Sequence, residues 1–77
     1  DSDTPHERFV TNETSEIVHR LLQELKQDYR EVLVLREYEQ MTYAEIADVT
    51  GTTESSVKSR IFKARKALTA RLKPFFQ

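Results

Sequence analysis

The most chemically distinctive residues of this chain are seven basic side chains gathered near its C-terminus. They lie in a stretch from Ser56 to Lys73 that has no acidic residue, and they are Lys58, Arg60, Lys63, Arg65, Lys66, Arg71 and Lys73. Residues 55–77 carry seven positive and no negative charges, whereas residues 1–54 carry five positive and thirteen negative ones. A segregated basic end is typical of a surface that binds a polyanion. The competing interpretation is a basic helix face that is simply solvated.

Few residues are suited to catalysis or to metal binding. The chain has no cysteine, and His6 and His19 are solitary. Its carboxylates show no spacing typical of a metal site or an acid–base pair. We interpret His19, beside Val18 in a predicted helix, as a surface residue or a hydrogen-bonded core residue. The sequence therefore predicts no enzymatic activity, no cofactor and no bound metal.

Length and composition favour one small cytoplasmic domain. The chain has 77 residues, near the lower end of what a single apolar core can stabilise. The lack of cysteine is compatible with a reducing compartment. The sequence has neither a basic head followed by an apolar run nor an apolar stretch long enough to cross a bilayer. We therefore expect a soluble, unprocessed, cytoplasmic protein that binds no membrane.

The basic stretch must be positioned by the elements that precede it, and the first of these is a helix. Residues 1–11 are polar and are interpreted as a linker or a frayed terminus, which leaves residues 12–77 as the folded domain. Apolar residues at helical spacing predict a first helix from Glu13 to Lys26. Thr11 or Asn12 is available as its N-cap.

A second helix is predicted from Tyr29 to Glu39. Asp28 and Glu31 have the spacing of a capping box, in which each side chain accepts a hydrogen bond from a free backbone amide. The run from Val32 to Leu35 is also compatible with a buried strand, because short apolar runs do not distinguish the two. The cap and the flanking charged residues favour the helix.

A third, short helix is predicted to start at Tyr43 and to end at Gly51. Thr42 and Glu45 repeat the capping-box spacing at its start. Gly51 is the only glycine in the chain, and a glycine can adopt the left-handed conformation that closes a helix.

A fourth helix follows directly, from about Glu54 to Arg71. Thr52 and Thr53 offer hydroxyl groups to cap it, and Pro74 ends the pattern. A short and a long helix joined by a tight turn at a glycine predict a helix-turn-helix within an all-α, four-helix domain. Its expected hinge core is formed by Ile46, Ala47, Val49, Val57 and Ile61.

The fourth helix has one apolar face and one basic face. At about 100° per residue its aliphatic residues fall within an arc of roughly 80°; they are Val57, Ile61, Ala64, Leu68 and Leu72. A contiguous stripe faces away from that arc and contains Lys58, Ser59, Phe62, Lys63 and Lys66. Phe62 either packs on a neighbouring loop or a partner, or contacts a thymine methyl group in a DNA groove. Arg60, Arg65, Arg71 and Lys73 point sideways, toward phosphates or solvent.

The segment Tyr29 to Leu68 resembles a known family. It reads "YREVLVLREYEQMTYAEIADVTGTTESSVKSRIFKARKAL", and its linked motifs "YREV", "MTYAEIA" and "VKSRIFKARKAL" are similar to region four of the extracytoplasmic-function (ECF) sigma factors of bacterial RNA polymerase. With the preceding helix and "DTPHERF", the resemblance covers nearly the whole chain. It implies a four-helix domain that binds the minus-thirty-five promoter element with its last helix in the major groove.

The resemblance also implies roles for individual residues. Lys58, Ser59, Phe62 and Lys63 correspond to the base-contacting stripe, and Arg60, Arg65 and Lys66 to backbone contacts; Ser56 completes the predicted DNA-binding set. The sequence departs from the family pattern at three places. Lys26 and Gln27 stand where a proline is common, Ser55 where glycine is frequent, and Lys63 where arginine is frequent.

Protein partners are implied by the resemblance alone. They are the β-subunit flap of RNA polymerase and an anti-sigma factor. Because a whole sigma factor needs a second domain that opens DNA, we expect this chain to be the C-terminal part of a longer protein. Two alternatives stay open: a protein-interaction module that docks through its acidic helices and Phe62, Phe75 and Phe76, and a helix-turn-helix effector domain of another transcription regulator.

Overall fold

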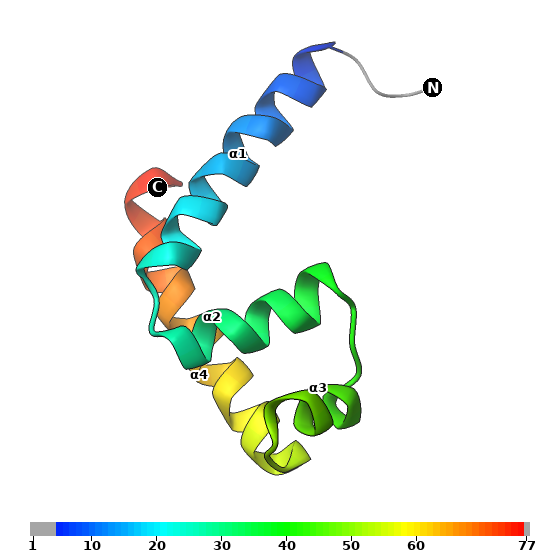
Figure 1. The fold of residues 1–77 in the computed structure, drawn as a ribbon. Coiled ribbons are helices and arrows are strands. Elements are labelled where there is room, and N and C mark those ends of the chain that lie inside the picture. Colours follow the sequence, from blue (N-terminus) through cyan, green and yellow to red (C-terminus); the bar gives the residue numbers. More distant parts are fainter. Residues whose placement is uncertain (1–4, 77) are drawn as a thin grey trace.

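The described part of the chain is built from helices. The computed structural model describes residues 5–76, with side chains for residues 13–76. Its elements are α1 (Pro5–Glu24), α2 (Gln27–Leu33), the π-helical segment η1 (Val34–Tyr38), α3 (Tyr43–Thr50), α4 (Glu54–Leu72) and the 3₁₀ turn η2 (Lys73–Phe75). The predicted all-α architecture with four α-helices is confirmed for these residues (Figure 1). Within them, every helix is too short or too polar to cross a membrane.

The first helix is longer than the sequence pattern predicted. It begins at Pro5 and ends at Glu24, so residues 5–11, interpreted as a linker, are helical, and Thr11 and Asn12 lie inside the helix rather than at its cap. Proline suits the first position of a helix, because its fixed φ is helical and its missing N–H would have had no partner there. The first four residues of the predicted linker lie outside the described residues. In Figure 1, α1 extends beyond the other helices.

The second predicted helix is divided into two parts. An α-helix runs from Gln27 to Leu33 and continues as the π-helical segment η1, so the alternative of a strand over Val32 to Leu35 is wrong. The predicted cap at Asp28 is also wrong. The N-cap position is held by Lys26, whose side chain makes no capping hydrogen bond within the described residues, and Asp28 lies in the first turn. There its negative charge favours the positive end of the helix dipole.

The end of η1 is closed by a residue in the left-handed conformation. The N–H of Glu39 donates to the carbonyl of Val34 at 3.1 Å, and the N–H of Met41 donates to the carbonyl of Leu35 at 3.0 Å. Between them, Gln40 has a φ of 55°. This is the arrangement that glycine usually provides at a helix end, and it turns the chain toward α3.

The predicted caps of the helix-turn-helix are confirmed. Thr42 Oγ1 accepts from the N–H of Glu45 at 3.1 Å, and Glu45 Oε1 accepts from the N–H of Thr42 at 2.8 Å. Gly51, with a φ of 68°, ends α3. Thr53 Oγ1 then accepts from the N–H of Ser56 at 3.1 Å and caps α4. These local hydrogen bonds fix both sides of the turn.

Substitutions at the two left-handed residues, Gly51 and Gln40, are expected to have opposite effects on stability. At Gly51 an added Cβ would meet no atom within 4 Å, so the cost of Gly51→Ala arises from backbone conformation alone. We expect it to lower the free energy of unfolding by about 1 kcal/mol and the Tm by about 4–8 °C. Gln40→Gly should raise the Tm, because it removes a Cβ from a left-handed residue. Thermal unfolding followed by circular dichroism measures both, and a Gln40→Gly variant less stable than wild type would contradict this account.

The long helix α4 is the centre of the packing. It contacts α1, α2 and α3, and its Val57, Ile61 and Ala64 are buried as predicted. Leu68 packs at the edge of the core. Among residues 13–76, the buried members of the main core cluster are Leu22, Leu25, Val32, Leu33, Ile46, Ala47, Val57, Ile61 and Ala64.

The prediction that Val49 belongs to the hinge core is wrong. Val49 is 60% exposed, whereas Ile46 and Ala47 are buried. At about 100° per residue, Val49 lies some 60° from Ile46 and some 160° from Ala47 around α3. The buried face of α3 is centred between Ile46 and Ala47, so Val49 lies beyond its edge.

Candidate nucleic-acid interface

The exposed face of α4 carries the residues predicted to read DNA. Lys58, Ser59, Phe62, Lys63 and Lys66 are all exposed; we call these five residues the groove stripe. They project from the side of α4 opposite Val57, Ile61 and Ala64, which are buried. The core therefore fixes the direction in which the groove stripe faces.

Phe62 is the least expected member of the groove stripe. Its side chain is 70% exposed, so it does not pack on a neighbouring loop among the described residues. An exposed aromatic ring between lysines offers an apolar surface that the rest of the stripe lacks. Contact with a partner or with an apolar group in a DNA groove is the interpretation that remains.

Beside the groove stripe, the first residue of α3 forms a stack of charged and aromatic groups. The ammonium nitrogen of Lys58 lies 5.7 Å from the centre of the Tyr43 ring, and the guanidinium carbon of Arg36 lies 4.7 Å from it. Arg36 Nη1 also donates to the carbonyl of Met41 at 2.7 Å, within the connection between η1 and α3. Tyr43 therefore supports the side chain of Lys58 from the α3 side.

A shallow hollow of about 560 Å³ lies on this flank of α4. Tyr43 contributes its ring, and α4 contributes Lys58, Phe62 and Lys66 among others. We call it the α3-side hollow. Its lining combines three cations, Lys58, Arg65 and Lys66, with two aromatic residues, so it can take a negatively charged or a flat group.

A second hollow, of about 310 Å³, lies near the start of α2. We call it the α2-side hollow, and it is lined by Lys26, Asp28, Tyr29, Ser56, Ser59, Arg60 and Lys63. The ammonium nitrogen of Lys26 lies 5.6 Å from the centre of the Tyr29 ring. The predicted residues Ser56 and Arg60, which are half-buried, belong to this flank of α4.

Sequence reasoning had not placed Lys26, Tyr29 or Tyr43 in the site. Lys26 was only a departure from the family pattern, and no spacing within the sequence connects it to α4. Tyr43 had the position of a helix start, which gives no indication of what its ring contacts. The three residues join the site only because the fold brings the starts of α2 and α3 against α4.

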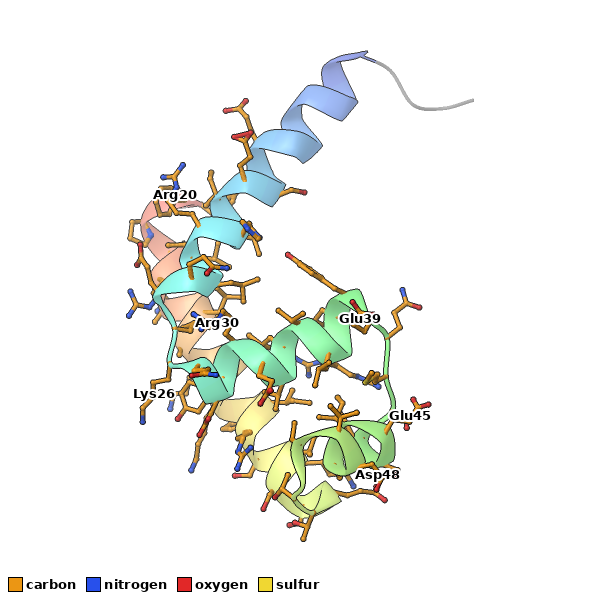
Figure 2. The ribbon with its side chains drawn as sticks, in the orientation of Figure 1. Arg20, Lys26, Arg30, Glu39, Glu45 and Asp48 are labelled. Carbon is orange, nitrogen blue, oxygen red and sulfur yellow. The ribbon has the colours of Figure 1, made fainter. Side chains whose placement is uncertain are left out.

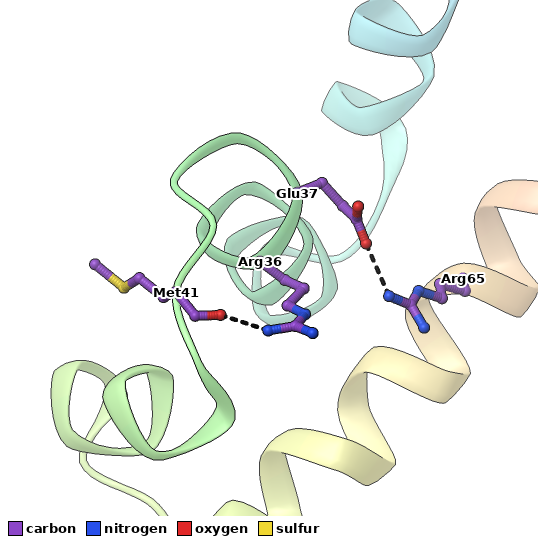
Figure 3. A network of polar contacts seen from close by, with 4 residues as sticks. All are labelled: Arg36, Glu37, Met41 and Arg65. Atoms are coloured by element: carbon purple, nitrogen blue, oxygen red, sulfur yellow. Dashed lines mark hydrogen bonds and ion pairs between the residues drawn. The ribbon is translucent and has the colours of Figure 1, made fainter.

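Two of the predicted sideways cations are paired with carboxylates of other helices. Arg65 Nη2 donates to Glu37 Oε2 at 2.8 Å, which connects α4 to η1 (Figure 3). Arg71 Nη1 donates to Glu24 Oε1 at 2.8 Å, which connects α4 to α1. Both pairs are about half exposed, so they contribute little stability. The guanidinium groups of Arg65 and Arg71 thus each contact a carboxylate, and Arg65 also lines the α3-side hollow.

Charges on the acidic helices are also divided in space. Figure 2 shows Lys26 and Arg30 at the start of α2, whereas Glu39, Glu45 and Asp48 lie at the opposite end, toward α3. Arg30 Nη1 donates to the carbonyl of Gln23 at 3.3 Å and so contacts the end of α1. Lys26 and Arg30 thus lie together near the start of α2, next to the carboxylate of Asp28 in its first turn.

Comparison with known proteins supports the resemblance of the motifs. Residues 15–68 match the family described as Sigma-70, region 4. The RNA polymerase sigma-H factor of Pseudomonas aeruginosa is 36% identical over 77 residues, which are 100% of this chain and 40% of that protein.

Two further relatives are ECF RNA polymerase sigma-E factors. The protein of Haemophilus influenzae is 32% identical over 74 residues, which are 96% of this chain and 39% of the relative. The protein of Escherichia coli K12 is 33% identical over 73 residues, which are 95% of this chain and 38% of the relative. The chain thus spans about two fifths of the length of the curated relatives it matches. With its family match over residues 15–68 and its helix-turn-helix, the chain belongs to the sigma-70 region 4 family.

Proposed function

We propose that this chain is the C-terminal domain of an ECF sigma factor that binds the minus-thirty-five promoter element. The observation that carries the proposal is the groove stripe, which is exposed on α4 directly after the helix-turn-helix turn. In helix-turn-helix proteins the second helix lies in the major groove, and residues of its N-terminal part contact base edges. Family membership supports the same assignment.

The proposed roles follow from the chemistry of each side chain. Lys58 and Lys63 donate hydrogen bonds to base acceptors, Ser59 donates or accepts one, and Phe62 contacts a thymine methyl group. Lys63 is a single point donor, whereas an arginine would grip a guanine with two parallel hydrogen bonds. Ser56, Arg60, Arg65 and Lys66 contact the backbone, which positions the helix without reading sequence.

The proposed contact of Arg65 with a phosphate requires a change of partner. In the structure its guanidinium is bonded to Glu37. Both Arg65 and Glu37 are about half exposed, and an exposed ion pair of this kind is weak. A phosphate oxygen accepts the same charge-assisted hydrogen bond, so exchange of carboxylate for phosphate is feasible.

We further propose that the domain works within RNA polymerase, in the cytoplasm. The relatives are named RNA polymerase sigma factors, and the resemblance implies the β flap and an anti-sigma factor as protein partners. Exposed apolar residues outside the groove stripe are available for such contacts; they are Tyr38, Val49, Phe75 and Phe76. If these partners bind apart from the groove stripe, their binding should survive alanine substitution of Lys58, Lys63 and Lys66 in a pull-down.

The groove assignment is tested by selecting bound duplexes from a random pool with the wild-type chain. We expect Phe62→Ala and Lys63→Ala each to reduce discrimination between the selected and a scrambled duplex by about tenfold, since one base contact is worth about 1–3 kcal/mol of discrimination. Phe75→Ala and Lys73→Ala are matched controls in η2. Unchanged discrimination in the Phe62 and Lys63 variants would show that the groove stripe does not read bases.

A further inference from the structure

The two hollows lie along opposite edges of the groove stripe. At about 100° per residue, the α4 residues of the α3-side hollow and those of the α2-side hollow are centred roughly 140° apart around the helix. The groove stripe occupies the arc between them. A helix that enters the major groove with this stripe forward therefore presents one hollow to each side of the groove.

The lining of the α2-side hollow matches the chemistry of a phosphodiester. Three cations surround it, Lys26, Arg60 and Lys63, against the single carboxylate of Asp28. Hydroxyl groups of Tyr29, Ser56 and Ser59 add donors. Protein contacts to DNA phosphates use these same groups, namely lysine, arginine and short hydroxyl side chains.

The side chain of Lys26 is held at this hollow by its surroundings. Its ammonium nitrogen lies over the Tyr29 ring at 5.6 Å, and Tyr29 packs against the core. A cation supported on a half-buried ring loses less rotamer freedom when it binds a ligand than one on a free stem. The acidic residues Glu39, Glu45 and Asp48 lie at the far end of α2 and η1 or on α3 (Figure 2).

We infer that the α2-side hollow binds a backbone phosphate of promoter DNA, with Lys26 as its principal new contact. This inference rests on the proposed function. In helix-turn-helix complexes the first helix of the motif, here α3, crosses the DNA backbone. The DNA strand on the α3 side is thus contacted by α3. The α2-side hollow lies on the other side of α4 and would bind a phosphate of the second strand, across a major groove that is about 12 Å wide.

The first test is the salt dependence of binding by Lys26→Ala. Each neutralised phosphate contributes about 0.9 to the slope of log K against log salt concentration. We expect the variant to lose about 0.9 of this slope and about eightfold in affinity at 0.1 M salt, for the selected and the scrambled duplex alike. Their ratio should stay unchanged, because a phosphate contact carries no sequence information. Since the Lys26 side chain makes no capping hydrogen bond within the described residues, the variant should fold, and circular dichroism checks this.

Arg20→Ala is the matched control, because it removes one positive charge from α1, away from Lys26 in Figure 2. An equal loss of slope in Arg20→Ala would mean that net charge alone is responsible, and it would overturn the inference. The same conclusion would follow from an unchanged slope in Lys26→Ala.

A second test identifies the phosphate directly. Selected duplexes carry one neutral methylphosphonate in place of a phosphate, moved position by position along each strand. At one position, on the strand opposite that contacted by α3, we expect the methylphosphonate to weaken DNA binding by the wild-type chain but not by Lys26→Ala. If the methylphosphonate weakens DNA binding by both proteins equally at every position, Lys26 binds no particular phosphate and the inference fails.

The two proposals fail in different ways. If Lys63→Ala loses discrimination while Lys26→Ala behaves as wild type, the proposed function stands and the phosphate site does not. If the wild-type chain binds selected and scrambled duplexes equally, the proposed function fails. The claim that the α2-side hollow binds a phosphate of the strand opposite α3 then fails as well.

Discussion

Replacing Ile61 with alanine is expected to lower the free energy of unfolding by about 3 kcal/mol, within the range of about 2–5 kcal/mol for such truncations in a core. Ile61 is 2% exposed and belongs to the main core cluster. It lies on α4, which packs against α1, α2 and α3, so the cavity would form where several helices meet. A domain of this size has a stability of about 4–11 kcal/mol in total. The variant should therefore lose a large part of its stability, and the Tm should fall by more than about 12 °C.

Val49→Ala is the matched control for this prediction. It also truncates an aliphatic side chain, but Val49 is 60% exposed, and a surface substitution of this kind should stay within about 0.5 kcal/mol of wild type. Urea unfolding of the three proteins measures the differences. Similar losses in both variants would mean that α3 and α4 do not pack as described.

Removing the three lysines of the groove stripe together is expected to have the largest effect on DNA binding. The variant changes Lys58, Lys63 and Lys66 to alanine and leaves every buried residue in place. If each lysine neutralises one phosphate or equivalent charge, the slope of log K against log salt falls by about 2.7, and the affinity at 0.1 M salt falls by about 500-fold. Fluorescence anisotropy over a range of salt concentrations measures both quantities.

The control for the triple variant removes the same amount of charge elsewhere. Arg20, Arg71 and Lys73 are changed to alanine, which takes one cation from α1, one from the end of α4 and one from η2. Arg71 is bonded to Glu24, so a small loss of stability accompanies its removal. We expect a much smaller loss of slope in this variant. If the two triple variants lose equal affinity, binding depends on net charge and the groove stripe has no special role.

The binding surface that these experiments address is wider than α4. Tyr43 supports Lys58 on one side, and Lys26 and Tyr29 face Lys63 across the α2-side hollow on the other. The groove stripe is therefore held between the starts of α2 and α3. This arrangement explains how a chain with a formal net charge of −1 can present one strongly basic face.

Much of the fold could be predicted from the sequence because the responsible interactions are local. The capping box of Thr42 and Glu45 and the cap at Thr53 each join residues three positions apart, and the left-handed conformation of Gly51 is a property of one residue. The helical spacing of Val57, Ile61 and Ala64 likewise fixed the buried face of α4 and, by exclusion, the exposure of Phe62. Motifs in the linear order of a known family then pointed to the sigma-70 region 4 fold.

Local patterns failed where more than one outcome was locally acceptable. Asp28 and Glu31 had the spacing of a capping box, yet α2 starts at Gln27, before Asp28. Residues 5–11 lacked an apolar period, yet they continue α1 because Pro5 suits a helix start and no residue there breaks the helix. Val49 had a suitable side chain for the hinge but lies beyond the edge of the buried face of α3 and is exposed.

By itself, then, the sequence determined the helices of the motif, their caps, the direction of the groove stripe and the family. Only the tertiary structure decided that Arg65 meets Glu37, that Arg71 meets Glu24 and that Lys26 lies beside Arg60 and Lys63. These partners are 28 or more positions apart. Long polar side chains on helix surfaces have no periodicity that selects one distant partner, so their contacts are set by how the buried faces of the helices pack.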